Sequence, residues 1–313
     1  MNDNTNTQSI YSRGTITYTM EMMRKKVDFL NKGFIIAGVI ALLAFFDFYI
    51  RMNGNNTFSL IILFVSLGVS GVFGLLKNKE NKVYRRFYKN EFLVFVLKEE
   101  LDNVVYNPKM GFSKANIAEK GFVKMGEIFS SEDYLKAEYN GISFVRADVD
   151  IKEKRKSGKQ TKIVNLFRGR VYEMDFNKQI SAGMQIVSKN FQYARTPSYL
   201  TRQDELETES VEFNSLFDVF TTHDEAAFYV LTPHMMERLM NMKRSFFSFS
   251  MGILGNKMYI AVRGGDSFEP PKSGTFEFEK EKEKVVSELQ EIKAIIEELN
   301  LTDRTFANVP NSL

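Results

Sequence analysis

Two long apolar segments, joined by a short polar stretch, dominate the hydropathy pattern of this chain. Residues 33–50 contain Asp47 as their only charged residue, and residues 58–76 contain none. As helices, these segments would each be about 27–29 Å long, close to the hydrocarbon thickness of a bilayer. Helices of globular proteins are rarely apolar on all sides over this length. The pattern therefore predicts a transmembrane helical hairpin over residues 33–76.

Basic residues flank the two spans unevenly. Several precede the first span and follow the second, whereas the tip between them carries only Arg51. Because positively charged flanks remain in the cytoplasm, we expect a multi-pass protein of the cell inner membrane with both termini cytoplasmic. Asp47 lies one turn before Arg51, which favours an ion pair at the membrane surface; an ion path is the alternative.

Small residues recur at intervals of four in both spans. They are Gly33, Ala37 and Ala41 in the first span, and Ser66, Ser70 and Gly74 in the second. This spacing lets helix backbones approach closely. We expect the two helices to pack on each other, or on another copy of the chain.

The polar stretch before the first span has the pattern of an amphipathic helix. Over residues 16–31, apolar side chains recur on one face at Met20, Met23, Val27 and Leu30. Such a helix is expected to lie at the membrane surface. The basic cluster Arg24, Lys25 and Lys26 would then contact anionic headgroups.

Beyond the spans, the period of the pattern alternates between helix and strand. Residues 77–103 have helical spacing, Ser113 can cap a short helix that Gly121 ends, and Asn140-Gly141 predicts a type I′ β-hairpin. Strands are also expected at residues 161–167, 170–176, 184–187 and 210–220, and a β-hairpin is expected to pair residues 247–251 with 258–262. Further helices are expected after the caps Asp224 and Thr232 and over residues 276–301.

The predicted fold class is α+β. A two-helix transmembrane hairpin precedes a cytoplasmic domain of mainly antiparallel sheet with flanking helices and a long C-terminal helix. The expected regions are a polar tail (1–32), the hairpin (33–76), the α+β domain (77–301, with a possible sub-boundary at 191–209) and a flexible tail (302–313).

A run of basic residues separates two predicted strands within residues 152–162, where Glu153 is the only acid. The simplest interpretation is a solvated hairpin tip. Near an anionic membrane, each basic residue would instead contribute about 1 kcal/mol of attraction. The candidate membrane-surface residues are therefore Arg24, Lys25, Lys26, Lys152, Lys154, Arg155, Lys156, Lys159 and Lys162.

The C-terminal helix carries a short heptad seam, formed by Val285, Leu289, Ile292, Ile296 and Leu299. A seam of this kind packs either on the domain's own sheet or in an intermolecular coiled coil. Because only two heptads are present, the first interpretation is favoured. The five residues remain candidates for a protein interface.

Composition narrows the chemistry further. The 313 residues include no Cys and two His, and the formal net charge is +3. The absence of cysteine excludes disulfides and thiolate metal sites. The positive and negative charges are nearly balanced, and such a composition does not indicate nucleic-acid binding. His234 and Glu237 share a helical face, but no third ligand is evident, so we predict no metal. Since no nucleotide-binding or hydrolase motif is present, we predict no cofactor and no catalytic residues, and an enzyme is the less favoured interpretation.

Several segments resemble a known family. They are FSSEDYLKAEYNGISFVRADV (129–149), FRGRVYEMDF (167–176), ESVEFNSLFDVFTTHDEAAFYVLTPHMMERL (209–239), KMYIAV (257–262) and SFEPP (267–271). Together they resemble a bacterial membrane-protein family of unknown function, domain of unknown function family number 3137. The resemblance implies one or two membrane spans followed by an α+β cytoplasmic domain. It implies no activity or catalytic residue.

Two functional hypotheses follow. The first is a membrane-anchored binding or scaffold domain that recruits a protein partner or self-associates through a sheet edge or the terminal helix. The alternative is a ligand-sensing or enzymatic domain near the lipid headgroups, docked by the basic loop. A channel or transporter is disfavoured, because two helices cannot enclose a pore without oligomerisation.

Overall fold

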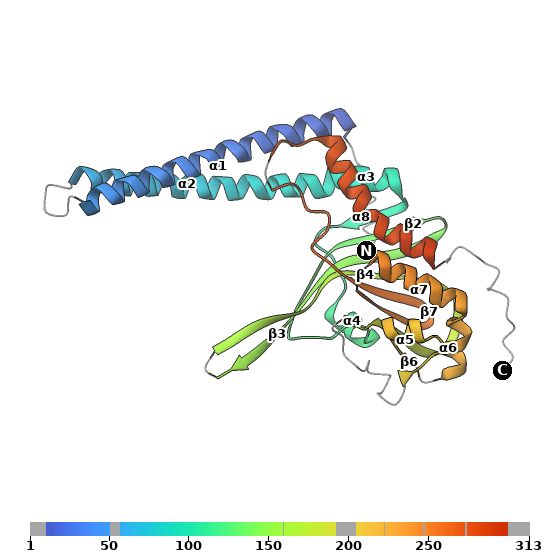
Figure 1. Cartoon of the computed structure of the whole chain (residues 1–313). Coiled ribbons are helices and arrows are strands. Elements are labelled where there is room, and N and C mark those ends of the chain that lie inside the picture. The colour runs from blue at the N-terminus through green and yellow to red at the C-terminus, as the bar shows by residue number, and fades with distance from the viewer. Residues whose placement is uncertain are drawn as a thin grey trace, which may run out of the picture. The chain divides into compact units, whose positions relative to one another are not determined.

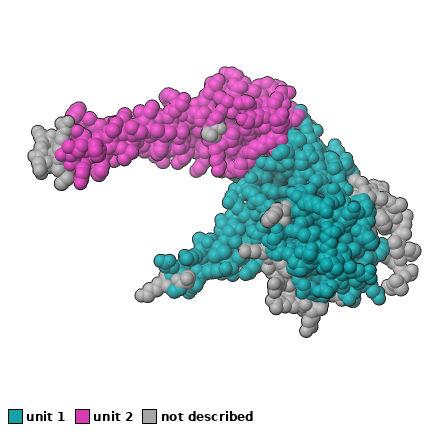
Figure 2. All heavy atoms as spheres, in the orientation of Figure 1, with its two compact units in different colours: residues 1–7, 96–268, 286–313 teal, residues 8–95, 269–285 magenta. Residues whose placement is uncertain are grey.

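A computed structural model describes residues 11–50, 57–158, 160–191, 205–221, 223–246, 248–272 and 274–299. The chain divides into two compact units, coloured separately in Figure 2. We call residues 8–95 and 269–285 the hairpin unit, and residues 1–7, 96–268 and 286–313 the sheet unit. Each unit is described separately. This division differs from the domain ranges expected from the sequence, which remain a prediction.

The hairpin unit is built on two long antiparallel helices, α1 (Arg13–Ile50) and α2 (Thr57–Phe87), seen in Figure 1. Both are long and apolar enough to cross a membrane. They pack closely: a Cβ on Gly33 would lie 2.4 Å from the Phe73 ring, and one on Gly74 would lie 3.3 Å from the Phe34 ring. The small-residue spacing therefore does what the sequence predicted, since each glycine accommodates an aromatic ring of the other helix.

The first helix is continuous, contrary to the prediction of a separate surface helix over residues 16–31. No proline interrupts the chain here, and the helix continues through Asn31 and Gly33, because one glycine in a helix costs only about 1 kcal/mol relative to alanine. The face containing Ile16, Met20 and Val27 is buried rather than available to lipid. Its apolar residues are thus core residues of the folded protein.

The second helix runs into a π-helical turn, η1 (Tyr88–Phe92), and then α3 (Leu93–Glu100). An aromatic cluster follows: the Phe92 ring meets Phe276 at 5.3 Å and Phe278 at 5.2 Å between centroids, both edge-on. Edge-to-face pairs of this kind stabilise packing by about 0.5–1.5 kcal/mol beyond the area they bury. They attach residues 276–278 to the hairpin.

The sheet unit contains a seven-stranded antiparallel sheet in the order β1-β2-β3-β4-β6-β5, with β7 also paired to β4. Its strands are β1 (Asp102–Asn107), β2 (Ile128–Tyr139), β3 (Ile142–Ser157), β4 (Gln160–Ser188), β5 (Glu205–Leu206), β6 (Phe217–Thr221) and β7 (Phe249–Arg263). Its helices are α4 (Lys114–Lys120), α5 (Val211–Leu216), α6 (Asp224–Val230), α7 (Pro233–Ser245) and the C-terminal part of α8 (Phe278–Glu298).

Strand alternation gives the sheet two buried faces. On one face, Val149, Val171 and Ala261 form an apolar cluster with Ile117 of α4. On the other face, Arg170 and Tyr172 reach α8, as described below. The mixed helix and sheet architecture confirms the predicted α+β class.

Several local predictions are confirmed. The Ser113 hydroxyl accepts a hydrogen bond from the Asn116 amide at 3.1 Å, and Gly121 ends that helix with φ of 65°. Thr232 caps α7 in the same way, by accepting from the Met235 amide. Asn140 and Gly141 both have positive φ between β2 and β3, as a type I′ turn requires.

Other local predictions were wrong. The segment 210–220 begins as helix α5, which Ser210 caps, and becomes strand only at Phe217. His223, rather than Asp224, precedes α6 at the N-cap position. The expected hairpin of 247–251 with 258–262 is one strand, β7, because both of its halves pair with β4. The three short strands expected between 161 and 187 are likewise one strand, β4.

Candidate functional site

A polar pocket lies between α1 and α2 in the hairpin unit, in the part of the two helices that adjoins the apolar segments on the side away from the tip of the hairpin. Its volume is about 360 Å³, and the segment Glu269–Lys272 closes one side. The lining side chains from each helix recur every three or four residues, so each helix presents one face to the pocket. They are Arg24, Val27, Asp28 and Asn31 of α1, and Lys77, Asn81 and Arg85 of α2.

Arg24 forms the floor of this pocket. Its guanidinium donates hydrogen bonds to the carbonyl oxygens of Gly274 and Lys272, both at 2.9 Å, and of Pro271 at 3.4 Å. It also pairs with Asp28 at 3.0 Å, and only 3 % of its surface is exposed. The side chain therefore holds the backbone at Pro271, Lys272 and Gly274 and is not available to lipid headgroups, contrary to its candidate role as a surface residue.

Glu269 lies between two cations on another wall of the pocket. Its carboxylate is 2.6 Å from Arg85 and 2.8 Å from Lys89, and its backbone carbonyl accepts a hydrogen bond from Lys284 at 2.6 Å. Glu269 therefore links two basic side chains of the hairpin unit.

Lys77 stands at the upper end of the pocket, immediately after the last apolar residue of the second span. Its ammonium group donates to the Asn31 amide oxygen at 3.0 Å and lies 5.0 Å from the centre of the Phe34 ring. Within the described residues, this cation has no carboxylate partner. The arrangement favours an anion at this point.

Of the other basic residues before the first span, Lys25 and Lys26 are largely exposed. Lys26 lies 2.8 Å from Glu80, and Lys25 is 3.9 Å from Glu21. Exposed pairs of this kind are weak, so both side chains remain available at the surface.

The basic stretch 152–162 forms the outer part of the β3–β4 hairpin, the two-stranded arm visible in Figure 1. Between Lys152 and Asn165, toward the tip of the hairpin, the described residues of β3 and β4 pair only with each other. Lys154, Arg155, Lys156 and Lys162 are exposed, whereas Lys152 is half-buried and pairs with Asp150 at 2.7 Å. Lys159 lies outside the described residues.

The sheet unit buries a charged cluster around Arg146, which is fully buried. Its Nη2 donates to Asp148 at 2.7 Å and to the Ser267 hydroxyl, and Ser267 donates its amide and hydroxyl hydrogens to the same carboxylate. Phe268 stacks on the guanidinium at 4.2 Å. The Nε and Nη1 groups of Arg146 have no partner among the described residues. No pattern in the sequence predicted this cluster.

A second polar cluster joins the sheet to α8. Glu291 accepts two hydrogen bonds from Arg170, at 2.7 and 2.6 Å, and one from the Tyr172 hydroxyl. Burial, together with the Glu291 charge, raises the pKa of Tyr172 well above its ordinary value. Tyr172 therefore acts as a permanent donor and not as a proton-transfer group.

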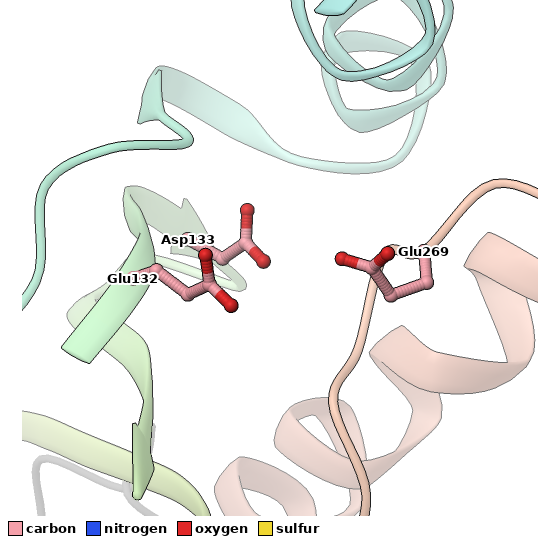
Figure 3. A group of neighbouring side chains, drawn as sticks. All are labelled: Glu132, Asp133 and Glu269. Atoms are coloured by element: carbon pink, nitrogen blue, oxygen red, sulfur yellow. The ribbon is translucent and has the colours of Figure 1, made fainter. Parts of the chain in front are cut away.

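Three carboxylates are labelled in Figure 3. Glu132 and Asp133 belong to the sheet unit, at the bulge that shifts the β2–β3 register. Asp133 is fully buried with φ of 59°, and it accepts a hydrogen bond from Tyr106. Burial is the main cause that raises the pKa of Tyr106, and the nearby charge of Asp133 raises it further. Glu269 belongs to the hairpin unit, where Arg85 and Lys89 hold it. We therefore assign these groups structural roles.

The histidines do not form a metal site among the described residues. The His234 ring lies 3.8 Å from Glu237, but Arg238 donates to its Nε2 at 3.1 Å, and this neighbouring cation opposes a metal ion. These residues line a second pocket of about 360 Å³ in the sheet unit, which Glu297 and Glu298 of α8 complete.

The heptad seam is used inside the protein. Val285, Leu289, Ile292, Ile296 and Leu299 are all buried, with at most 2 % of their surface exposed. The seam is therefore not a free surface for a coiled coil, and the interface candidates of the C-terminal helix are core residues.

The architecture defines a mixed α+β protein with two helices that could span a membrane. The family model "Protein of unknown function (DUF3137)" matches residues 165–301 and confirms the family resemblance. No curated protein matches. Among solved structures, the mycobacterial trehalose monomycolate transport factor A, TtfA, is 10 % identical, with a TM-score of 0.34 over 69 % of this chain and 97 % of that one. A likeness at this level supports no argument about function.

Proposed function

We propose that this is a membrane-anchored binding protein whose α1–α2 hairpin spans the bilayer and anchors the sheet unit to the membrane. The main observation that supports this proposal is the exposure of the apolar segments. Leu42, Phe64 and Leu75 are 69 %, 69 % and 74 % exposed, and most of their apolar neighbours on both helices are exposed as well. Water disfavours such surface by roughly 25 cal/mol per Å². A lipid environment removes this penalty.

The polar groups within the spans fit the same proposal. Asp47 accepts a hydrogen bond from the Ser59 hydroxyl at 2.5 Å, near the tip of the hairpin. A carboxylate at this level lies at the membrane surface, where a charge costs much less than at mid-bilayer. The basic flanks favour a cytoplasmic location for the termini and for the sheet unit.

A binding role is supported by an available sheet edge. Among the residues that the structure describes, strand β1 pairs with β2 alone, and Val105 on this strand is 52 % exposed. Unpaired edges are frequent sites of strand addition by partner proteins. We propose that a protein partner, or a second copy of the chain, pairs with this edge.

Site-specific cross-linking in intact cells tests the binding role. A photo-reactive amino acid at Val105 should yield a reproducible cross-linked protein, identified by mass spectrometry. The same group at exposed Ala115 of α4 is the matched control and should not yield that product. Identical products from both positions, or none at Val105, would contradict binding at the edge.

A second function, docking on anionic lipid, is favoured by the β3–β4 arm. Cross-strand pairing places Lys154 opposite Ile163 and Arg155 opposite Lys162. Ile163 is 61 % exposed beside the lysine, and directly opposed cations destabilise a ribbon by roughly 0.2–1 kcal/mol. An anionic surface would compensate these charges and cover the isoleucine.

The cysteine-free chain permits a direct test of arm docking. The full chain carrying Ile163→Cys is labelled with a polarity-sensitive dye and reconstituted in nanodiscs. We expect blue-shifted emission with phosphatidylglycerol but not with phosphatidylcholine alone. Replacing Lys154, Arg155, Lys156 and Lys162 by Gln should abolish the shift. Equal emission in both lipids would exclude docking.

A further inference from the structure

We propose that the pocket below the membrane spans binds a phosphoryl group, carried either by an anionic phospholipid headgroup or by a free phosphate ester. The pocket is lined by four basic and two acidic side chains, so it has excess positive charge. Its volume of about 360 Å³ accommodates a headgroup-sized ligand. The inference for lipid rests on the proposed membrane anchoring, whereas that for a free ester does not.

The excess charge is localised on two side chains. Arg24 is engaged by backbone carbonyls and Asp28, and Arg85 is paired with Glu269. Lys77 and Lys272 remain, and within the described part of the chain neither has a carboxylate partner. Two ammonium groups without a carboxylate partner thus line one pocket, and their charge attracts an anion.

The framework of this site is fixed before a ligand arrives. Arg24 ties three carbonyls of the loop that carries Lys272, while Asn31 and the Phe34 ring position the Lys77 ammonium. The pocket does not need to order the loop backbone or the Lys77 ammonium on binding, which lowers the entropic cost of association. Asn81, which also lines the pocket, supplies a further amide donor.

The height of the pocket along the helices favours a lipid headgroup. Lys77 directly follows the apolar segment of α2, and Asn31 lies two residues before that of α1. Eight residues separate Lys77 from Arg85, so the pocket extends about 12 Å away from the span. Its upper end therefore coincides with the headgroup layer, where basic pockets between helices bind anionic lipids.

Native mass spectrometry of the full chain in detergent tests this site. Delipidated protein is mixed with phosphatidylglycerol or phosphatidylcholine, and binding of inorganic phosphate is measured separately by calorimetry. We expect preferential retention of phosphatidylglycerol. The double variant Lys77→Gln, Lys272→Gln should lose about tenfold or more in affinity, the effect of losing a charge-assisted hydrogen bond.

Lys79→Gln is the control for charge loss on α2, since it removes one positive charge two residues after Lys77, at a side chain that does not line the pocket. Lys77→Arg should retain binding if the double variant does not fold. Selective loss of phosphatidylglycerol assigns the site to lipid, and selective loss of phosphate binding assigns it to a free ester. Equal binding of both ligands by the wild type, the double variant and Lys79→Gln overturns the proposal. Alkaline extraction of the same variants from membranes reports separately on anchoring.

Discussion

Arg146 shows how a single buried charge constrains the core of the sheet unit. It is fully buried, and its ion-pair partner among the described residues is Asp148, a carboxylate that Ser267 also engages. Buried ion pairs stabilise little compared with apolar side chains of similar size, but a lone buried ion is very unfavourable. The pair therefore matters chiefly because each member requires the other.

Removing Asp148 alone should be far more destabilising than removing both charges. We expect Asp148→Ala to lower the free energy of unfolding by about 3–5 kcal/mol, since it leaves Arg146 uncompensated. The double variant Arg146→Met, Asp148→Leu should recover most of this loss. Urea unfolding of the full chain, followed by circular dichroism, measures both. Equal losses in the single and double variants would mean that the pair acts through packing alone.

Glu91 provides a test of pH dependence. Burial raises its pKa above the ordinary value of 4.5, so the folded protein binds a proton more readily than the unfolded chain. Its contribution to stability is therefore present at low pH and is lost as the pH rises through the raised pKa. We expect Glu91→Gln to raise the melting temperature by a few °C at pH 7 and to have little effect near pH 4. A lower melting temperature of Glu91→Gln than of the wild type at pH 7 would contradict the expected direction of the effect.

The α1–α2 hairpin depends on one close approach between its helices. A side chain at Gly33 would collide with the Phe73 ring, whereas nothing lies within 4 Å of a Cβ at Gly38 on the same helix. We expect Gly33→Val to separate the helices and lower stability by about 1–3 kcal/mol. Gly38→Val is the matched control and should be nearly neutral.

The helix separation is measured by spin-label distances between α1 and α2 in detergent. Adding Phe73→Ala to Gly33→Val should restore the wild-type distance, because it removes the ring that the valine displaces. Unchanged distances in Gly33→Val would show that the glycine is not required for packing.

Local chemistry could be read from the sequence wherever neighbouring residues decide the structure. The caps Ser113 and Thr232, and the Asn140-Gly141 turn, are such cases. Where distant pairing decides, local patterns were insufficient. Strand β1 was expected to be partly helix, because its register with β2 was not visible in the sequence. Strand β7 was divided at Gly252–Lys257, although its pairing with β4 continues on both sides.

The whole molecule contains one arrangement that the sequence could not indicate. Residues 269–285 return to the hairpin unit almost 200 positions after α2, through Phe276, Phe278 and the carbonyls that Arg24 binds. The polar pocket exists only because of this return. In the sequence, Lys77 is one of several basic residues that follow the second span, and no pattern connects it with Lys272. Conversely, the apolar pattern alone was sufficient to predict the hairpin.

The central claim is that the α1–α2 hairpin crosses a membrane, and cysteine accessibility tests it most directly. Asn55→Cys lies between the spans, and Ala115→Cys lies in the sheet unit of an otherwise cysteine-free chain. With a membrane-impermeant maleimide on intact cells, we predict labelling of the first, and labelling of the second only after permeabilisation. Labelling of both positions from the same side would contradict the account.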